Sequence, residues 1–131
     1  MSTRGEIVID NGDTHPKYTG IYCGHDSYLS GLGEVLENHY TTEEKVRELI
    51  SMGGASSVYS TIDECDFYAR DAGEEIEIDN FESDEDLKKE GHNIFCEYLY
   101  LFRDGKWLVF DTDDDTFITL DEARKRWESD D

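Results

Sequence analysis

The chain has 131 residues and carries 33 Asp and Glu against 12 Lys and Arg, which gives a formal net charge of -21. Such a field repels the phosphates of nucleic acids and anionic membranes, and it favours binding to a cationic surface, such as that of a nucleic-acid-binding protein. The length suits a single domain, residues 1–131, and the 37% of hydrophobic residues indicate a folded core with acidic loops.

Two short runs of strand-forming residues, 6–10 and 19–23, open the chain. Turn-favouring residues such as Gly12 and Pro16 separate them, so we expect these runs to pair as a hairpin. A helix is predicted next, from Gly31 to Tyr40, because apolar side chains recur there at helical spacing.

A second helix is predicted directly afterwards. Thr41 and Glu44 have the spacing of a capping box, three apolar residues between 46 and 50 form a stripe, and the Gly-Gly pair at 53–54 is a stop signal. Two helices joined so closely form a corner with one apolar side, which a sheet or another helix must cover.

The segment 61–90 holds 13 acidic and three basic residues, so its net charge of -10 is nearly half that of the chain. Within it, residues 75–79 are predicted to form a strand with Ile76 and Ile78 on one face. Residues 82–91 are expected to form a loop or a single helical turn. A solvated linker and a functional acidic surface explain this segment equally well at the level of the sequence.

The clearest strand signal lies in residues 93–111, where two β-rich runs flank an Asp-Gly pair at 104–105 that suits a type I′ hairpin turn. Apolar residues occupy both parities of the first run, so both faces of this strand should be covered. A third strand over 117–120 and a final helix with Thr119 and Glu122 as a capping box complete the pattern. The expected fold is α+β: an antiparallel sheet with a two-helix corner packed on it and a short C-terminal helix.

The three cysteines, Cys23, Cys65 and Cys96, lie far apart, and the first ten residues contain no long apolar run of the kind found in a secretory signal. A reduced, cytoplasmic setting is therefore expected. No window of the sequence approaches the roughly 20 apolar residues that a membrane helix requires, so no membrane association is predicted.

Four acidic residues near the C-terminus follow the ligand order of an EF-hand loop: Asp111, Asp113, Asp115 and Glu122. Against calcium binding, Thr116 occupies the sixth place, where the sharp turn normally requires Gly, and a strand rather than a helix is expected before the loop. The alternative is an acidic hairpin turn without a metal.

No catalytic motif stands out in the sequence. Cys23, His25 and Asp26 lie within four residues, yet they lack the paired spacing of zinc ligands, and the negative field opposes a reactive thiolate. The chain also has no glycine-rich phosphate loop and no nucleophile elbow. We therefore expect no enzymatic activity and no cofactor.

Three segments match the motifs of a known family: IYCGHDSYLSGLGEVLENHYTTEEKVRELISMG, FYARDAGEE and EYLYLFRDGKWLVFD. The first is similar to Ile-Tyr-x-His-Trp-Asp-Gly-Tyr followed by a Gly-x-Gly that opens a helix ending in Tyr. The second resembles Tyr-His-Arg-Asp-Arg-Gly-Glu, and the third resembles a closing hairpin with a Trp. The family is a widespread one of small uncharacterised proteins from phages and bacteria. The matching positions are Ile21, Tyr22, Asp26, Tyr28, Gly31, Gly33, Leu36, Tyr40, Tyr68, Arg70, Asp71, Gly73 and Glu74. The resemblance implies a phage or prophage setting, where small acidic proteins often block host defence. We interpret Asp26, Arg70 and Asp71 as a structural network rather than a catalytic group.

These observations lead to one functional hypothesis: a phage-encoded interaction protein of the anti-CRISPR or anti-restriction type, which mimics nucleic acid and occupies the cationic groove of a host defence nuclease. Its partner would be a basic nucleic-acid-binding protein in the host cytoplasm, and direct binding to nucleic acid is not expected. The predicted contact residues are Glu74, Glu75, Glu77, Asp79, Glu82, Asp84, Glu85, Asp86, Asp113, Asp114 and Asp115. A domain that binds calcium or another metal, adaptation to high salt, and a small enzyme of unknown type are the alternatives.

Overall fold

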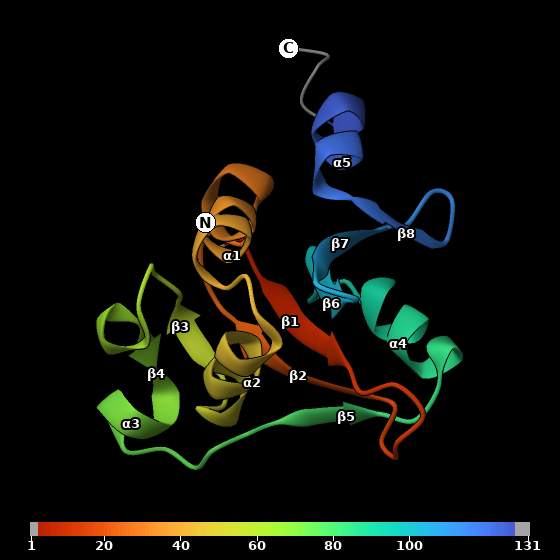
Figure 1. Ribbon diagram of the computed structural model, residues 1–131. Coiled ribbons are helices and arrows are strands. Elements are labelled where there is room, and N and C mark those ends of the chain that lie inside the picture. Colours follow the sequence, from red (N-terminus) through yellow and green to blue (C-terminus); the bar gives the residue numbers. More distant parts are fainter. Residues whose placement is uncertain (1–2, 128–131) are drawn as a thin grey trace.

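The computed structural model describes residues 3–127, which form an eight-stranded sheet covered by helices (Figure 1). The strands are β1 (Gly5–Asp10), β2 (Tyr18–Cys23), β3 (Ala55–Ser57), β4 (Asp66–Phe67), β5 (Asp79–Phe81), β6 (Tyr98–Arg103), β7 (Lys106–Asp111) and β8 (Thr116–Thr119). Seven of them lie in the order β4-β3-β2-β1-β6-β7-β8, and β5 pairs with the first half of β2.

Helices cover both faces of the sheet. They are the π-helical turn η1 (Leu29–Gly33), α1 (Glu34–His39), α2 (Glu43–Ser51), the 3-10 turn η2 (Ile62–Glu64), α3 (Tyr68–Ala72), α4 (Asp84–Gly91) and α5 (Leu120–Trp127). Ile7 and Ile21 belong to the core cluster shared with η1, α1, α2 and α5. Val8 and Leu101 pack on the opposite face with Leu87 of α4. None of the helices between residues 3 and 127 is long and apolar enough to cross a membrane.

The predicted α+β fold is confirmed, and the sheet is mixed rather than antiparallel throughout. β1 and β2 form the predicted opening hairpin, with Ile7 opposite Ile21. However, β1 also runs parallel to β6, and β2 runs parallel to β3. Local patterns predict hairpins because their strands adjoin in sequence, but they do not say which distant strands become neighbours. The five consecutive buried residues of β1, 5–9, suit a central strand covered on both faces.

The helical corner forms as predicted, with small shifts at its boundaries. The first helix begins with η1 and continues as α1, so it covers residues 29–39 rather than 31–40. α2 is capped by Thr42, whose hydroxyl accepts a hydrogen bond from the Lys45 N–H at 3.2 Å. The predicted cap, Thr41, is therefore wrong by one residue. Gly53, with a φ of 80°, ends the helix at the predicted stop.

Helix α4 was not expected from the sequence. Residues 82–91, predicted as a loop or a single turn, contain this eight-residue helix. The Ser83 hydroxyl caps it by accepting a hydrogen bond from the Asp86 N–H at 3.2 Å, and Leu87 is fully buried against the sheet. Because only one large apolar side chain anchors the helix, the sequence carries almost no periodic signal for it.

The strand predicted over residues 75–79 is wrong for most of its length. β5 begins only at Asp79, and residues 73–78 cross the surface without regular secondary structure. Ile76 and Ile78 are 60% and 38% exposed, so the alternation of apolar and acidic residues does not mark a half-buried strand here. The stretch lines a cleft instead.

The C-terminal third follows the prediction closely. Asp104 and Gly105 both have positive φ, 52° and 77°, as a type I′ turn between β6 and β7 requires. β6 contributes side chains to both core clusters, so both of its faces are covered as expected. The Thr119 hydroxyl accepts a hydrogen bond from the Glu122 N–H at 3.2 Å and caps α5.

Candidate functional site

The structure separates the predicted contact residues into carboxylates that already have an ionic partner and carboxylates that do not. The paired ones are Asp84 with Lys17 at 2.9 Å, Asp114 with Arg126 at 2.8 Å and Asp115 with Lys88 at 3.7 Å. Two carboxylates also contact a histidine, which is charged only when protonated: Glu82 lies 2.7 Å from His15, and Asp115 lies 2.8 Å from His92. Among residues 3–127, no ion pair engages the others, which are Glu74, Glu75, Glu77, Asp79, Glu85, Asp86 and Asp113.

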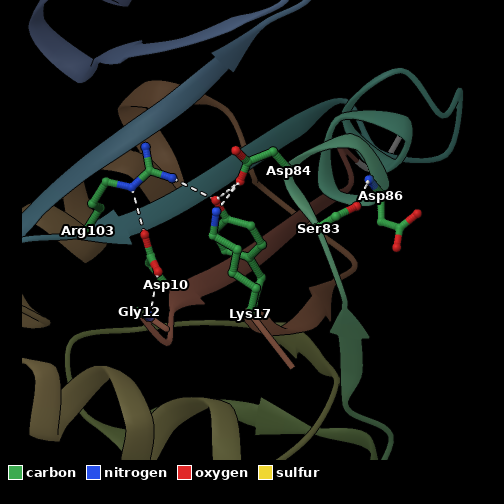
Figure 2. A network of polar contacts seen from close by, with 8 residues as sticks. Asp10, Gly12, Lys17, Ser83, Asp84, Asp86 and Arg103 are labelled. Carbon is green, nitrogen blue, oxygen red and sulfur yellow. Dashed lines mark hydrogen bonds and ion pairs between the residues drawn. The ribbon is translucent and has the colours of Figure 1, made fainter. Parts of the chain in front are cut away.

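Asp84, the first residue of α4, is fixed by a network that joins the helix to the sheet (Figure 2). The Tyr18 hydroxyl donates to Asp84, and Arg103 Nη2 donates to the Tyr18 oxygen at 2.8 Å. Arg103 Nε donates to Asp10 at 2.8 Å. The hydrogen bonds from Tyr18 and then Lys17 hold the pKa of the Asp84 carboxyl below its usual value. Asp84 therefore anchors α4, and its charge is already engaged.

An arginine of α5 engages three acidic residues around the predicted calcium loop. Arg126 Nη1 lies 2.7 Å from Asp111 Oδ2 and 2.8 Å from Asp114 Oδ2, and its Nε lies 3.1 Å from Glu122. Asp111 is buried, and its Oδ1 accepts a hydrogen bond from the Asp113 N–H at 3.0 Å. Between residues 3 and 127, no group of three or more Asp, Glu, His or Cys side chains is placed to hold a metal ion. The geometry is that of an acidic hairpin turn stabilised by an arginine.

Four of the carboxylates without an ion pair line one cleft of about 260 Å³, which we call the acidic cleft. Its lining residues are Tyr22, Gly54, Tyr68, Glu74, Glu75, Glu77 and Asp79. No lysine, arginine or histidine is among them, so this lining supplies no counterion for its own negative charge. The acidic cleft is the place where unpaired carboxylates and aromatic rings meet.

Backbone hydrogen bonds fix the walls of the acidic cleft. The Gly54 N–H donates to the Glu77 carbonyl at 3.2 Å, and the Tyr68 N–H donates to the Gly54 carbonyl at 3.2 Å. The Glu74 N–H donates to the Tyr68 carbonyl at 3.0 Å. Gly73, with a φ of 74°, lets the chain reverse after α3. The acidic side chains are therefore carried by a hydrogen-bonded backbone.

Tyr22 and Tyr68 form the aromatic part of the cleft, which sequence analysis did not assign to a site. Tyr22 belongs to β2 and Tyr68 begins α3. A Cβ atom at Gly24 would lie 2.7 Å from Tyr68 Oη and 3.4 Å from the Tyr22 ring, so a larger residue there would displace the Tyr68 hydroxyl. Gly24 therefore leaves the space in which the Tyr68 hydroxyl lies near the Tyr22 ring.

Glu6 is a buried carboxyl beside the acidic cleft, and sequence analysis missed it. It is 2% exposed, and its Oε2 has no hydrogen-bond partner among residues 3–127. Burial first, and then the carboxyl of Asp79, raise the pKa of Glu6 well above its ordinary value. A hydrogen bond between these two carboxyls requires that one of them carries a proton. The available signal in the sequence was an acid directly before the apolar run 7–9 of the predicted first strand, at the same parity as Val8.

Arg70 and Asp71 have a structural role in the turn that precedes α3. The Arg70 guanidinium donates to Asp71 at 2.9 Å and to the backbone carbonyls of residues 62, 63 and 65, the shortest at 2.6 Å. Asp71 also accepts a hydrogen bond from the Phe67 N–H at 2.8 Å. No hydrogen bond or ion pair within residues 3–127 joins Asp26 to this pair. The predicted network therefore joins Arg70 with Asp71 and does not include Asp26.

The cysteines are buried, and none forms a catalytic pair with histidine. Cys23, Cys65 and Cys96 are free thiols inside the core. Burial raises the pKa of Cys23 and of Cys96, which keeps these thiols protonated. Cys23 Sγ lies 3.5 Å from the His25 carbonyl, whereas His25 Nδ1 lies 3.0 Å from the carbonyl of Ser56.

Exposed acids also occur on the face of the sheet opposite α4. α2 presents Glu43, Glu44 and Glu48 to solvent, and Glu43 pairs with Arg47 at 2.8 Å. The net charge is therefore spread over both layers. What distinguishes the acidic cleft is its aromatic wall and its buried neighbour Glu6.

Comparisons with protein families, curated proteins and solved structures found no match for this chain. The resemblance to a family from phages and bacteria therefore stays a prediction.

Proposed function

We propose that this protein binds the cationic nucleic-acid groove of a partner protein and blocks it as an acidic mimic of nucleic acid. The observation that carries the proposal is the stretch 74–86, which has eight carboxylates and no basic residue. Six of these carboxylates form no ion pair with any residue from 3 to 127. Like charges on an ordered backbone repel one another, and a cationic surface that covers them relieves this repulsion.

The contact surface of this proposal is narrower than the one expected from composition. It keeps the four carboxylates of the acidic cleft together with Glu85 and Asp86 of α4. It gives less weight to Asp84, Asp114 and Asp115, because each of these already has a lysine or arginine partner within the chain, and to Glu82, which contacts His15.

A host defence nuclease is the partner class that the family resemblance favours, and the protein would then act as a phage-encoded inhibitor in the host cytoplasm. Nucleases of this kind hold their substrate in a groove lined by Lys and Arg. Inhibition would be competitive, because a groove filled by carboxylates excludes DNA. Association should be fast and should weaken as salt increases.

The test is a competition assay in which the purified chain displaces labelled DNA from purified CRISPR effectors and restriction nucleases. We expect displacement that weakens with salt, and weaker displacement by the double variant Glu75→Gln/Glu77→Gln. The matched control is Glu44→Gln/Glu48→Gln on α2, which removes the same charge from the opposite face of the sheet. Equal loss in both variants, or no displacement from any nuclease, would overturn the proposal.

A further inference from the structure

The acidic cleft has the composition of a pocket for one organic cation. Its volume of about 260 Å³ lies below the roughly 300–1,000 Å³ of pockets for drug-sized ligands, so it suits a single long side chain. The faces of Tyr22 and Tyr68 attract cations through their ring quadrupoles. The surrounding carboxylates provide acceptors for charge-assisted hydrogen bonds.

Glu6 points to a ligand independently of the exposed acids. It lies opposite Tyr22 in the pairing of β1 with β2, so both side chains project from the same face of the sheet. Its carboxyl neighbours that of Asp79, which lines the cleft. Apart from the Asp79 carboxyl, with which it can share a proton, Glu6 Oε2 has no hydrogen-bond partner among residues 3–127. A buried carboxyl with no cation and no ordinary donor beside it is costly and uncommon in folded proteins. A cation that enters the cleft would supply that donor.

The shape and the lining favour an organic cation over a metal ion. Within residues 3–127 no three potential metal ligands converge, and two tyrosine rings occupy part of the lining. A guanidinium group uses both features, because its plane stacks on an aromatic ring while its edge forms paired hydrogen bonds with a carboxylate. A lysine ammonium is a point charge and uses only one of them.

We propose that the acidic cleft binds one guanidinium group, supplied by an arginine side chain of the basic partner. The inference rests on the proposed function, for which it names the anchoring contact. The arginine stacks on the tyrosine rings and donates to the carboxylates of Asp79 and Glu6. Glu6 releases its proton to solvent when the arginine enters, because the cation offsets the burial of a negative charge.

The first experiment is an NMR titration of the purified protein with N-acetyl-arginine amide. We expect saturable shifts of the backbone amides of Tyr22, Gly54, Tyr68 and Asp79. N-acetyl-citrulline amide has nearly the same shape without the charge and should cause no shifts. Equal binding of the citrulline amide, or shifts that spread over α2 without saturation, would overturn the inference.

A second set of measurements tests the role of Glu6. Glu6→Gln should weaken binding of the arginine amide about tenfold, as expected for the loss of one charge-assisted hydrogen bond, whereas Glu44→Gln on the exposed face of α2 should leave it unchanged. In the parent protein binding should tighten as pH rises, and the Gln variant should lose this dependence. The other titratable groups that face Glu6 are Asp79, Glu90 and Cys96, and they remain in both proteins. Equal affinity of Glu6→Gln and parent would overturn the inference.

Two further outcomes separate this inference from the proposed function. N-acetyl-arginine carries a carboxylate that the cleft repels, so it should bind more weakly than the blocked amide, and tighter binding of N-acetyl-arginine would refute a protein side chain as the ligand. Binding of the amide without displacement of DNA from any nuclease would remove the proposed function and support the guanidinium pocket. If the protein displaces DNA but does not bind the arginine amide, only the guanidinium pocket is refuted.

Discussion

Leu87 tests how firmly α4 is docked on the sheet. Its side chain is fully buried and lies in the same core cluster as Val8 and Leu101. Leu87→Ala removes three carbon atoms, which at about 0.8 kcal/mol for each buried methylene gives a transfer cost of about 2.4 kcal/mol. A cavity that stays partly open adds to this cost, so we expect the free energy of unfolding to fall by about 3 kcal/mol, within the ~2–5 kcal/mol range of buried Leu to Ala changes.

Urea unfolding followed by circular dichroism measures this loss, and the melting temperature should fall by roughly 10 °C for a chain of this size. Lys89→Ala is the control, because Lys89 is exposed on the same helix and its loss should change stability by no more than about 0.5 kcal/mol. A loss below about 1 kcal/mol for Leu87→Ala would refute the reasoning, since α4 would then not be held by a buried side chain.

Glu6→Gln should raise the free energy of unfolding at about pH 8 and change it little near pH 4. The reason is that a carboxyl with a raised pKa stabilises the fold while it is protonated, and this contribution is lost as pH rises through its folded pKa. Urea unfolding across this pH range checks it, and a Gln variant less stable than the parent at the higher pH would contradict it. Tyr40→Phe removes the hydrogen bond that its hydroxyl donates to the Tyr59 carbonyl at 2.8 Å and should cost about 1 kcal/mol in thermal unfolding, whereas Tyr28→Phe at an exposed position should cost almost nothing. The three buried cysteines should react with a thiol reagent slowly in the folded protein and readily in denaturant, and a thiol that reacts at once in native buffer would show that its burial is wrong.

Turns and helix caps that depend only on residues close in sequence could be predicted from the sequence. The turn at Asp104 and Gly105 needs positive φ at both positions, and few residue pairs other than Asp-Gly supply it so readily. The cap of α5 is equally local, because the Thr119 hydroxyl and the Glu122 N–H are three residues apart. Such signals are complete within a few residues, so the rest of the fold does not change them.

Features that depend on distant neighbours could not be predicted. The parallel pairing of β1 with β6 joins residues more than 90 positions apart, as in Gly5 with Tyr98, and no local pattern encodes that contact. α4 is held by Leu87 and by the close approach of Gly91 to the Phe110 ring. A single leucine in an acidic stretch does not create a helical period, so tertiary packing decides the conformation there.

The candidate site could be predicted only in part from the sequence, because it too depends on contacts between distant residues. Composition counts carboxylates, but it does not show which of them a distant cation already neutralises. Asp84 meets Lys17 across 67 positions of sequence, and Asp114 meets Arg126 across 12. The sequence therefore showed the segment 61–90 as a concentration of negative charge, while the division between paired and unpaired acids required the fold.

The buried Glu6 bears on the choice between a binding surface and adaptation to high salt. Acidic surfaces that serve salt adaptation act through hydrated, exposed carboxylates, and Glu44 and Glu48 of α2 fit that description. Glu6 is withdrawn from water and faces further carboxyls, so it contributes neither hydration nor an internal ion pair. Glu6 lies beside the tyrosines of the acidic cleft, where a cation from a partner would offset its buried negative charge. For that reason we favour recognition of a basic partner over adaptation to high salt.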